Sequence, residues 1–359
     1  MAVIGHLPPS SGRDGTLSAA AFNPTVDTPP QLSAANISVV VPVGGAARDW
    51  PRAARSLGRF EPPPGEIIVV IDGVNQQASE TAASIGARVI QLDQRSGPAR
   101  ARNLGAHAAS GEIVLFLDAD IEAPPDLPGR IARIFVERPE LTAVMGSYDA
   151  RPGDPGMVSQ YRNLLHHFIH QAARERASTF WTGCGAIRRT ALLEAGGFNE
   201  RYREPAIEDI ELGVRLVRTG HAIRLEKTLQ VTHLKRWRLG EMLATDLWRR
   251  AVPWNELMLS ERQTVNDLNV RTLDRLSVVV AFLALAAFAG TWRSLAFTGA
   301  GLLGLGLIAA LNASFFSLLA RRKGAFFALQ SVPLYWLYLL VCGVGFVFGV
   351  SRHLLGARS

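Results

Sequence analysis

Short apolar runs separated by polar turns fill the chain from Ile37 to about residue 240. Three of these runs, at residues 38–43, 66–71 and 113–117, are continuous rather than spaced like one face of a helix. This pattern is typical of strands buried on both faces of a sheet. Segments with helical spacing lie between them, at residues 48–59, 79–86 and 98–109. The alternation predicts an α/β domain whose mostly parallel sheet carries helices on both faces.

The pattern continues with weaker strand signals at residues 88–92 and 141–146 and at a strand that ends on His233. Residues 159–177 predict an amphipathic helix. A second helix, over residues 207–216, has a predicted apolar face of Ile210, Val214 and Val217.

Three segments near the C-terminus, residues 276–292, 294–320 and 325–350, contain no charged residue. A membrane span needs about 20 apolar residues, so the second and third segments are long enough and the first is marginal. Buried core helices are a poor alternative because the segments have no polar face. Basic residues precede the first segment and follow the second, which predicts that the domain before them and the 321–323 loop are cytoplasmic. Arg352 and Arg358 in the tail fit this topology less well.

Two further segments complete the predicted organisation. Residues 1–36 are rich in Pro, Ser, Gly and Ala and predict a disordered leader without a signal peptide. Residues 238–275 mix Trp and Arg with apolar residues, which suits the lipid headgroup layer, and Pro253 is expected to break the helix there. The predicted parts are therefore a leader (1–36), a catalytic domain (37–237), an interfacial segment (238–275) and a transmembrane region of about three helices (276–359).

Composition adds two constraints. The 359 residues carry a formal charge of +7, which fits either nucleic acid or anionic lipid. With the apolar segments present, we expect a membrane partner and no nucleic acid. Cys184 and Cys342 form neither a disulfide framework nor a zinc-binding spacing, which favours a reducing compartment.

The strongest candidate chemistry is at the end of the 113–117 run, where Asp118 and Asp120 follow directly. The strand would deliver both carboxylates to the edge of the sheet where open α/β sheets bind ligands. Two carboxylates this close repel each other unless a cation or a donor lies between them, and oxygen ligands suit Mg²⁺ or Mn²⁺. A strand that stops at a polar turn is the alternative, and it would be preferred for an isolated pair.

Other candidate residues are weaker one by one. Trp181, Gly183 and Cys184 lie in a glycine-rich stretch that would let a ligand approach the backbone, although an ordinary turn explains it equally well. Cys184 has no visible partner base, so we interpret it as a small lining residue. Glu208 and Asp209 begin a helix, whose dipole would lower the pKa of Asp209 and keep it ionised; plain helix capping is the alternative.

Histidines and glycines suggest two rival sites. His166, His167 and His170 resemble metal ligands, but a cleft wall or a surface is the better interpretation because no glutamate stands between them and arginines follow. A nicotinamide-dependent oxidoreductase would share the strand–helix alternation. Residues 43–48 lack the third glycine of that fingerprint, and only Asp72, at the end of the second strand, supports it.

Taken together, several motifs resemble family 2 glycosyltransferases over roughly residues 37–240. They are residues 38–43, Asp72, residues 97–105, Asp118-Ala-Asp120, Glu208-Asp209 and residues 231–233. The resemblance implies a GT-A fold, a mixed sheet flanked by helices, and transfer of a sugar from a nucleotide donor with inversion at the anomeric carbon. It also implies a divalent cation, Mg²⁺ or Mn²⁺.

The resemblance implies a role for each matching residue. Pro42 and Asp72 would border the nucleoside base, Arg102 would support the nucleotide pocket, and Asp118 would lie by the ribose and the metal. Asp120 would bind the metal, His233 would reach the metal or the diphosphate, and Asp209 would be the general base. Acceptor or supporting roles would fall to Trp181, Gly183, Cys184, Glu208, Arg236 and Trp237.

Two departures from the family pattern bear on this prediction. The second strand ends in a single acid, Asp72, where the family often has paired acids. The stretch His233-Leu-Lys-Arg-Trp237 resembles the Gln-x-x-Arg-Trp motif of processive and ceramide glucosyltransferase-like enzymes, with His in place of Gln. We interpret His233 as the terminal histidine of the non-processive members.

The sequence therefore predicts a membrane-bound, inverting glycosyltransferase at the cytoplasmic face of the inner membrane. A UDP- or GDP-sugar would be the donor, and a lipid-linked or membrane-proximal hydroxyl, on a lipid or a glycan, would be the acceptor. Two alternatives stay open: a processive or ceramide glucosyltransferase-like enzyme, and a membrane-anchored nucleotide-sugar-binding protein without turnover.

Overall fold

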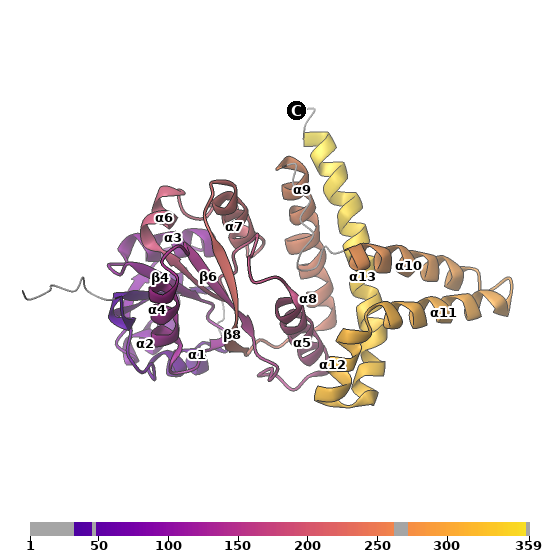
Figure 1. The fold of residues 1–359 in the computed structure, drawn as a ribbon, viewed down its shortest axis with the longest axis horizontal. Helices are drawn as coiled ribbons and strands as arrows, with labels where there is room; N and C mark the ends of the chain where they lie inside the picture. The colour runs from indigo at the N-terminus through magenta and orange to yellow at the C-terminus, as the bar shows by residue number, and fades with distance from the viewer. Residues whose placement is uncertain (1–31, 45–47, 262–271, 357–359) are drawn as a thin grey trace, which may run out of the picture. The chain divides into compact units, whose positions relative to one another are not determined.

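The computed structural model describes residues 32–44, 48–261 and 272–356, in which a mixed sheet flanked by helices precedes a group of long helices (Figure 1). The eight strands follow the order β3-β2-β1-β4-β7-β6-β8-β5. Their bounds are β1 Ile37–Gly44, β2 Glu66–Asp72, β3 Arg88–Gln91, β4 Ile113–Leu117, β5 Ile121–Glu122, β6 Ala143–Tyr148, β7 Cys184–Arg188 and β8 Ile223–His233.

The first half of the sheet is parallel, as the apolar runs predict. β1 pairs in parallel with β2 and with β4, and β2 pairs in parallel with β3. β7 runs antiparallel to both β4 and β6, which makes the whole sheet mixed. Because parallel strands end at one edge, Asp72 at the end of β2 and Asp118 just after β4 lie on the same side of the sheet.

Helices cover both faces of the sheet, which confirms the predicted layers. One apolar core contains residues of α1 (Trp50–Leu57), α2 (Gln76–Ser84) and α4 (Leu127–Glu137). The other contains residues of α3 (Pro98–Ala108), α6 (Arg189–Glu194) and α7 (Glu208–Arg218). α5 (Met157–Ala172) packs instead in a third core with the C-terminal helices.

The predicted apolar face of α7 is partly wrong. Leu212 and Leu216 are fully buried, whereas Ile210 and Val217 are only partly buried. Gly213 explains the difference, because a Cβ there would lie 2.0 Å from the backbone nitrogen of Phe180. α7 therefore packs closely against the backbone of residues 179–180 on the side where Gly213 lies.

The N-terminal prediction is wrong at its boundary. Residues 34–36 form a short 3-10 helix, η1 (Ala34–Asn36), that leads directly into β1. The rest of the predicted leader lies outside the described residues.

After β8 and the irregular residues 234–238, the chain is helical over residues 239–260, in α8 (Leu239–Ala244), η2 (Thr245–Ala251) and α9 (Val252–Ser260). η2 is a π-helix, a rare form that is frequent at functional sites. The predicted break at Pro253 is wrong. Pro253 lies in the first turn of α9, where its missing N–H is tolerated. The change from π-helical to α-helical geometry occurs at the start of this turn.

Four apolar helices follow: α10 (Thr272–Ala289), α11 (Leu295–Leu311), α12 (Ala313–Lys323) and α13 (Ala325–Gly356). Among the described helices, α10 and α13 are each long and apolar enough to cross a membrane. α11 and α12 qualify only together and are bent by 81°. The predicted second span is therefore a bent pair, and the number of candidate spans is two, or three if that pair is one span.

The bend follows from a polar contact inside the helix group. Asn312, between α11 and α12, donates to Ser277 Oγ at 3.0 Å and accepts from Tyr335 Oη at 2.9 Å. These hydrogen bonds hold the break against α10 and α13, because a buried amide must keep its partners.

The helix group packs directly onto the sheet domain. Tyr161 and Leu165 of α5 share a core with Phe315 and Leu319 of α12. α9 and η2 lie against α13, and α8 and α9 run beside α13 in Figure 1. The helices that follow β8 therefore connect the sheet with the apolar region.

Candidate active site

A cleft of about 580 Å³ lies at the carboxyl edge of the sheet. Its walls come from the ends of β1, β2, β4 and β8 on one side, and from α5 and η2 on the other. Nine Arg and Lys side chains and five Asp and Glu side chains line it, which makes its surface strongly positive. The predicted site residues among the lining are Pro42, Asp72, Arg102, Asp118, Asp120, His233, Arg236 and Trp237.

Arg102 is the centre of a buried charge cluster. Its guanidinium contacts Asp118 Oδ1 at 2.8 Å and Glu208 Oε1 at 2.7 Å. Burial raises the pKa of Asp118, although Arg102 opposes that effect. The repulsion expected between Asp118 and Asp120 is therefore relieved on the Asp118 side by a protein cation.

Asp72 has a structural use at the cleft. Its two carboxylate oxygens accept hydrogen bonds from the backbone N–H groups of Ser96 at 2.6 Å and Gly97 at 3.0 Å. These contacts fix the start of α3, the helix that carries Arg102.

Asp120 faces His233 across the cleft. The β5–β8 pairing brings Ile121 opposite His233, and Asp120 Oδ2 lies 3.4 Å from His233 Nε2. Burial favours a higher pKa for Asp120, but the imidazole and then Lys235 outweigh it, so its pKa lies below the usual value. Tyr148 stacks on His233 with a ring separation of 4.3 Å and fixes the imidazole.

The donor set fits a divalent ion that is shared with a substrate. Asp120 and His233 offer one carboxylate and one imidazole, and the side chain of Asp120 is 30% exposed to the cleft. Within the described residues, no group of three or more potential ligands converges. Mg²⁺ and similar ions are commonly held by one or two carboxylates together with substrate phosphates, so two protein ligands are sufficient.

Asp209 lies in the first turn of α7 and is not among the residues that line the cleft. Its Oδ2 accepts hydrogen bonds from Thr182, from the backbone N–H at 3.0 Å and from the hydroxyl at 3.1 Å. Burial, followed by the neighbouring charge of Glu208, raises the pKa of Asp209 to about 6. The predicted lowering by the helix dipole is therefore wrong, because desolvation and a like charge exceed the dipole effect.

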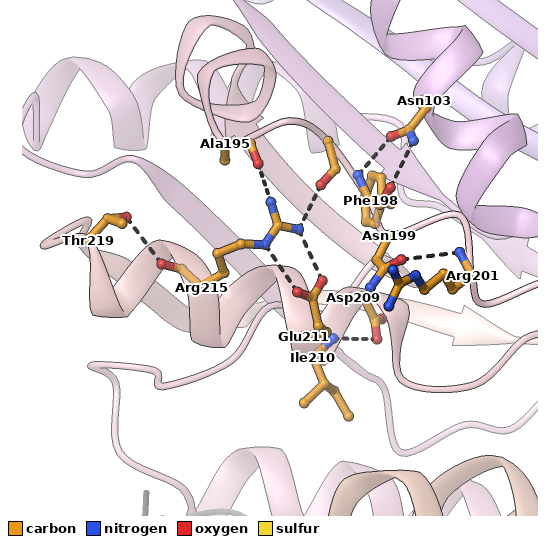
Figure 2. Close-up of polar contacts among 11 residues, drawn as sticks. Asn103, Ala195, Phe198, Asn199, Arg201, Asp209, Ile210, Glu211, Arg215 and Thr219 are labelled. Atoms are coloured by element: carbon orange, nitrogen blue, oxygen red, sulfur yellow. Dashed lines mark hydrogen bonds and ion pairs between the residues drawn. The ribbon is translucent and has the colours of Figure 1, made fainter. Parts of the chain in front are cut away.

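A polar network holds α7 against α3 (Figure 2). Arg215 donates to the backbone carbonyl oxygens of Ala195 and, at 2.8 Å, Gly197. Asn103 of α3 donates to Phe198 O at 2.9 Å and accepts from Phe198 N at 2.8 Å. The loop between α6 and α7 is therefore hydrogen-bonded to both α7 and α3. These contacts fix the positions of Asp209, on α7, and Arg102, on α3, relative to each other.

The glycine-rich stretch lies in the wall and does not line the cleft. Trp181 packs edge-on against Tyr148 at a ring separation of 4.9 Å. A Cβ on Gly183 would lie 2.2 Å from the Trp181 ring, so this glycine admits the indole. Cys184 is buried in β7, and burial raises the pKa of its thiol to about 12, which makes it a poor nucleophile.

The three histidines of α5 have separate environments. His167 Nδ1 lies 2.7 Å from Tyr148 O and His170 Nδ1 lies 3.2 Å from Gly146 O, and both residues are buried. His166 lines the cleft, and burial lowers its pKa well below the usual value, so it is neutral. Of the two predicted positions, a cleft or the surface, the cleft fits His166 alone, and both are wrong for His167 and His170, which are buried against backbone carbonyls.

Sequence reasoning missed part of the cleft. Arg162 and Asn163 of α5, Tyr148, and Arg249 and Arg250 of η2 all line it. Arg162 pairs with Asp246 of η2 at 2.5 Å, and both are buried. An arginine on the apolar face of the predicted 159–177 helix was an available signal, because a buried charge needs a partner.

Comparisons with known proteins agree with this geometry. Residues 38–197 match the family model Glycosyl transferase family 2. The chain is 26% identical over 220 residues to the pre-mycofactocin glycosyltransferase of Mycobacterium tuberculosis, covering 58% of this chain and 45% of the relative. It is 29% identical over 167 residues to the undecaprenyl-phosphate 4-deoxy-4-formamido-L-arabinose transferase of Pectobacterium atrosepticum, covering 43% and 48%. The chain thus spans less than half the length of each of these two relatives.

A solved structure supports the fold. The mannosyltransferase PcManGT from Pyrobaculum calidifontis, in complex with GDP-Man and Mn²⁺, superposes with a TM-score of 0.55. The match covers 87% of both chains at 17% sequence identity, which establishes similarity of fold. With the family match and the arrangement of the sheet edge, residues 38–197 therefore belong to a family 2 glycosyltransferase domain of the GT-A fold.

Proposed function

We propose that the chain is a membrane-bound, inverting glycosyltransferase that uses a nucleotide-sugar donor and a lipid-linked or membrane-proximal acceptor. One observation carries the proposal. A single cleft is lined both by Asp118 and Asp120 at the sheet edge and by arginines of η2, a helix that packs on apolar α13. The donor chemistry and the apolar helices thus meet at one site.

The donor side is formed by the sheet edge. Pro42, Asp72 and Asp118 line the cleft, and Arg102 holds Asp118. In this proposal Pro42 and Asp72 border the nucleoside base and Asp118 lies by the ribose. Asp120 and His233 would hold a divalent cation, which would neutralise the diphosphate and so stabilise it as a leaving group. The Mn²⁺ and GDP-Man in the PcManGT complex support this assignment for the shared fold.

Asp209 is the proposed base. Inverting transfer requires removal of one proton from the acceptor hydroxyl while its oxygen attacks the anomeric carbon and the nucleoside diphosphate departs with the bonding electrons. With a pKa of about 6, Asp209 is largely ionised at neutral pH yet basic enough to accept that proton. Its present hydrogen bonds to Thr182 keep it outside the cleft lining, so the carboxylate must turn toward a bound acceptor.

The acceptor side is formed by α5 and the interfacial helices. The relative from Pectobacterium atrosepticum acts, by its name, on undecaprenyl phosphate, which supports a lipid-linked acceptor. The basic cluster Arg321–Lys323 ends α12 and supports a cytoplasmic position for that end and for the catalytic domain. We propose the inner membrane as the location, with α10 and α13 as anchors.

The test is a transfer assay on the purified full chain in lipid nanodiscs. UDP- and GDP-sugars are supplied with a lipid extract, with Mn²⁺ or with EDTA. We expect one donor class to give lipid-linked product that disappears with EDTA and returns with added Mn²⁺. Turnover that is unchanged by EDTA would exclude the cation role. Long polymer among the products would favour a processive enzyme, and donor binding without any product would favour a binding protein.

A further inference from the structure

Two arginines of the cleft lie on the side of the apolar helices. Arg162 belongs to α5 and Arg250 to η2, and both line the cleft. Arg162 is satisfied by Asp246, at 2.5 Å, inside the protein. Among the described residues, the buried carboxylate of Asp246 thus pairs with Arg162 and forms no ion pair with Arg250.

Arg250 is unlike the other cations of the cleft. Arg102, Arg162, Lys235 and Arg249 each have an ion pair with an acid. Arg48, Arg95, Arg236 and Arg238 are exposed, so water solvates and screens their charges. Among the described cleft residues, Arg250 is the only partly buried cation with neither an ion pair nor a hydrogen bond to a side chain or backbone group.

Its electrostatic surroundings leave a place for an anion. Burial, and then repulsion by Arg162, lower the pKa of Arg250, while Asp246, Tyr148 and Asp209 only partly compensate. The neighbouring histidine, His166, is neutral and gives no relief. A guanidinium in this position gains most from a bound anion, because charge-assisted hydrogen bonds are stronger where water is partly excluded.

The donor does not provide that anion. The diphosphate of a nucleotide-sugar carries about two negative charges, which the divalent ion at Asp120 and His233 would balance. The cleft still has four more Arg and Lys side chains than Asp and Glu side chains, nine against five. Acids outside the lining pair with Arg102, Arg162 and Arg249, which leaves Arg250 as the partly buried cation available for a second anionic group.

The position of Arg250 indicates the source of that group. η2 packs on α13, one of the two helices able to cross a membrane, and Trp248 on the same helix is exposed. Trp and Arg together are typical of the headgroup layer of a bilayer. An anion that reaches Arg250 from this layer is a phosphoryl group at the end of a lipid chain.

We propose that Arg250, supported by the Arg162–Asp246 pair, binds the phosphoryl group of a lipid-phosphate acceptor. This inference rests on the proposed function and narrows its acceptor class from any membrane-proximal hydroxyl to a hydroxyl on a phosphate-bearing lipid. Asp209 would still accept the proton of that hydroxyl, while Arg250 holds the phosphoryl group. The proposal also gives the π-helix η2 a functional role, because η2 carries both Asp246 and Arg250.

The test measures binding and requires no turnover. Full-length protein in neutral-lipid nanodiscs is titrated with undecaprenyl phosphate and with undecaprenol, which has the same chain without the phosphate. We expect the wild type to prefer the phosphate, and Arg250→Gln to lose about tenfold or more of that preference, the scale of a lost charge-assisted hydrogen bond. Arg322→Gln, which removes an equal charge from the exposed end of α12, controls for general attraction to anionic lipid and should retain the preference.

Two further arms separate the alternatives. If Arg250→Gln fails to fold, Arg250→Lys keeps the charge beside Asp246 and should lose part of the preference, because one ammonium cannot reproduce the guanidinium fork. Donor titration without acceptor lipid asks whether Arg250 serves the diphosphate instead. A preference unchanged in both Arg250 variants, or a loss confined to donor binding, would overturn the inference, whereas absence of sugar transfer alone would count only against the proposed function.

Discussion

At the scale of single residues, the carboxylates of the site differ because their partners differ. Asp118 is paired with Arg102, Asp120 faces His233, and Asp209 accepts hydrogen bonds from neutral donors, namely Thr182 and the backbone N–H of Ile210. The pKa of Asp120 is lowered while that of Asp209 is raised to about 6. Environments that shift the pKa values of two acids in opposite directions are typical of a division of roles. Here one acid would be a cation ligand and the other a base.

Asp209→Asn should separate these roles. The change keeps the size of the side chain and removes its ability to accept a proton, so we expect the turnover number to fall by roughly 10²-fold or more. Donor affinity, measured by titration calorimetry, should stay close to wild type, because Asp209 lies outside the residues that line the cleft. Asp120→Asn is the matched comparison and should weaken Mn²⁺-dependent donor binding. Near-normal transfer by Asp209→Asn would move the base elsewhere, with Glu208 as the next candidate.

The pH profile gives an independent test of Asp209. Because the base must be ionised, kcat/KM should rise with pH through an apparent pKa of about 6. The folded-state pKa exceeds the value of 3.8 for a free side chain, so the native state binds more protons between these values. The contribution of Asp209 to the free energy of unfolding should therefore fall as the pH rises from about 4 to about 6. A rate profile without an acidic limb near 6 would contradict the assignment.

At the scale of elements, close helix packing decides where the cleft arginines lie. α13 approaches η2 and α9 through glycines, and a Cβ on Gly345 would lie 2.4 Å from the Cβ of Ala251. Ala251 directly follows Arg250, so the distance between these helices fixes the position of that guanidinium.

Gly345→Ala should therefore disturb the site through packing alone. Overpacking at this contact should lower the free energy of unfolding by about 1–3 kcal/mol, observed as a lower Tm in detergent, and reduce transfer to lipid acceptors. Gly306→Ala in α11 is the control, because a Cβ there meets no atom within 4 Å. Equal melting temperatures for the two variants would show that the α13–η2 contact is looser than the structure has it.

At the scale of the whole molecule, the sheet domain and the helix group are one packed unit rather than a domain on a flexible tether. Tyr161 of α5, Trp237 after β8 and Phe315 of α12 share one core. Large apolar side chains of α10 and α11, such as Leu283 and Leu303, are exposed in this unit at 65% and 76%. Apolar surface of this extent is consistent with a membrane anchor, because contiguous exposed patches are rare on soluble monomers.

This exposure predicts an integral membrane protein. After expression, the full chain should stay in the membrane pellet through alkaline carbonate and high-salt washes and be released by detergent, because burial of the exposed apolar side chains outweighs the loss of surface charge attraction. A peripheral marker protein, washed in parallel, should be released by carbonate. Release of this chain by salt or carbonate would remove α10 and α13 as anchors.

Much of the fold was predictable because the signals are local. The apolar runs of β1, β2 and β4 identify buried strands without reference to the rest of the chain, and the acids that follow β4 reach the sheet edge by the geometry of a strand alone. The uncharged C-terminal segments identify candidate spans for the same reason. For Asp118, Asp120 and Asp209, spacing and the family resemblance predicted candidate roles that the experiments above would test.

Tertiary structure decided the properties that depend on partners distant in sequence. The sequence placed Arg162 on an apolar helix face and Asp246 in an interfacial segment, and only packing of α5 against η2 brings the two together. The pKa of Asp209 rises because folding buries it beside Glu208, an effect larger than the local helix dipole. The 81° bend at Asn312 depends on hydrogen bonds to Ser277 and Tyr335, which an apolar stretch does not reveal. Local periodicity determines which elements form, while desolvation and long-range pairing determine what their side chains can do.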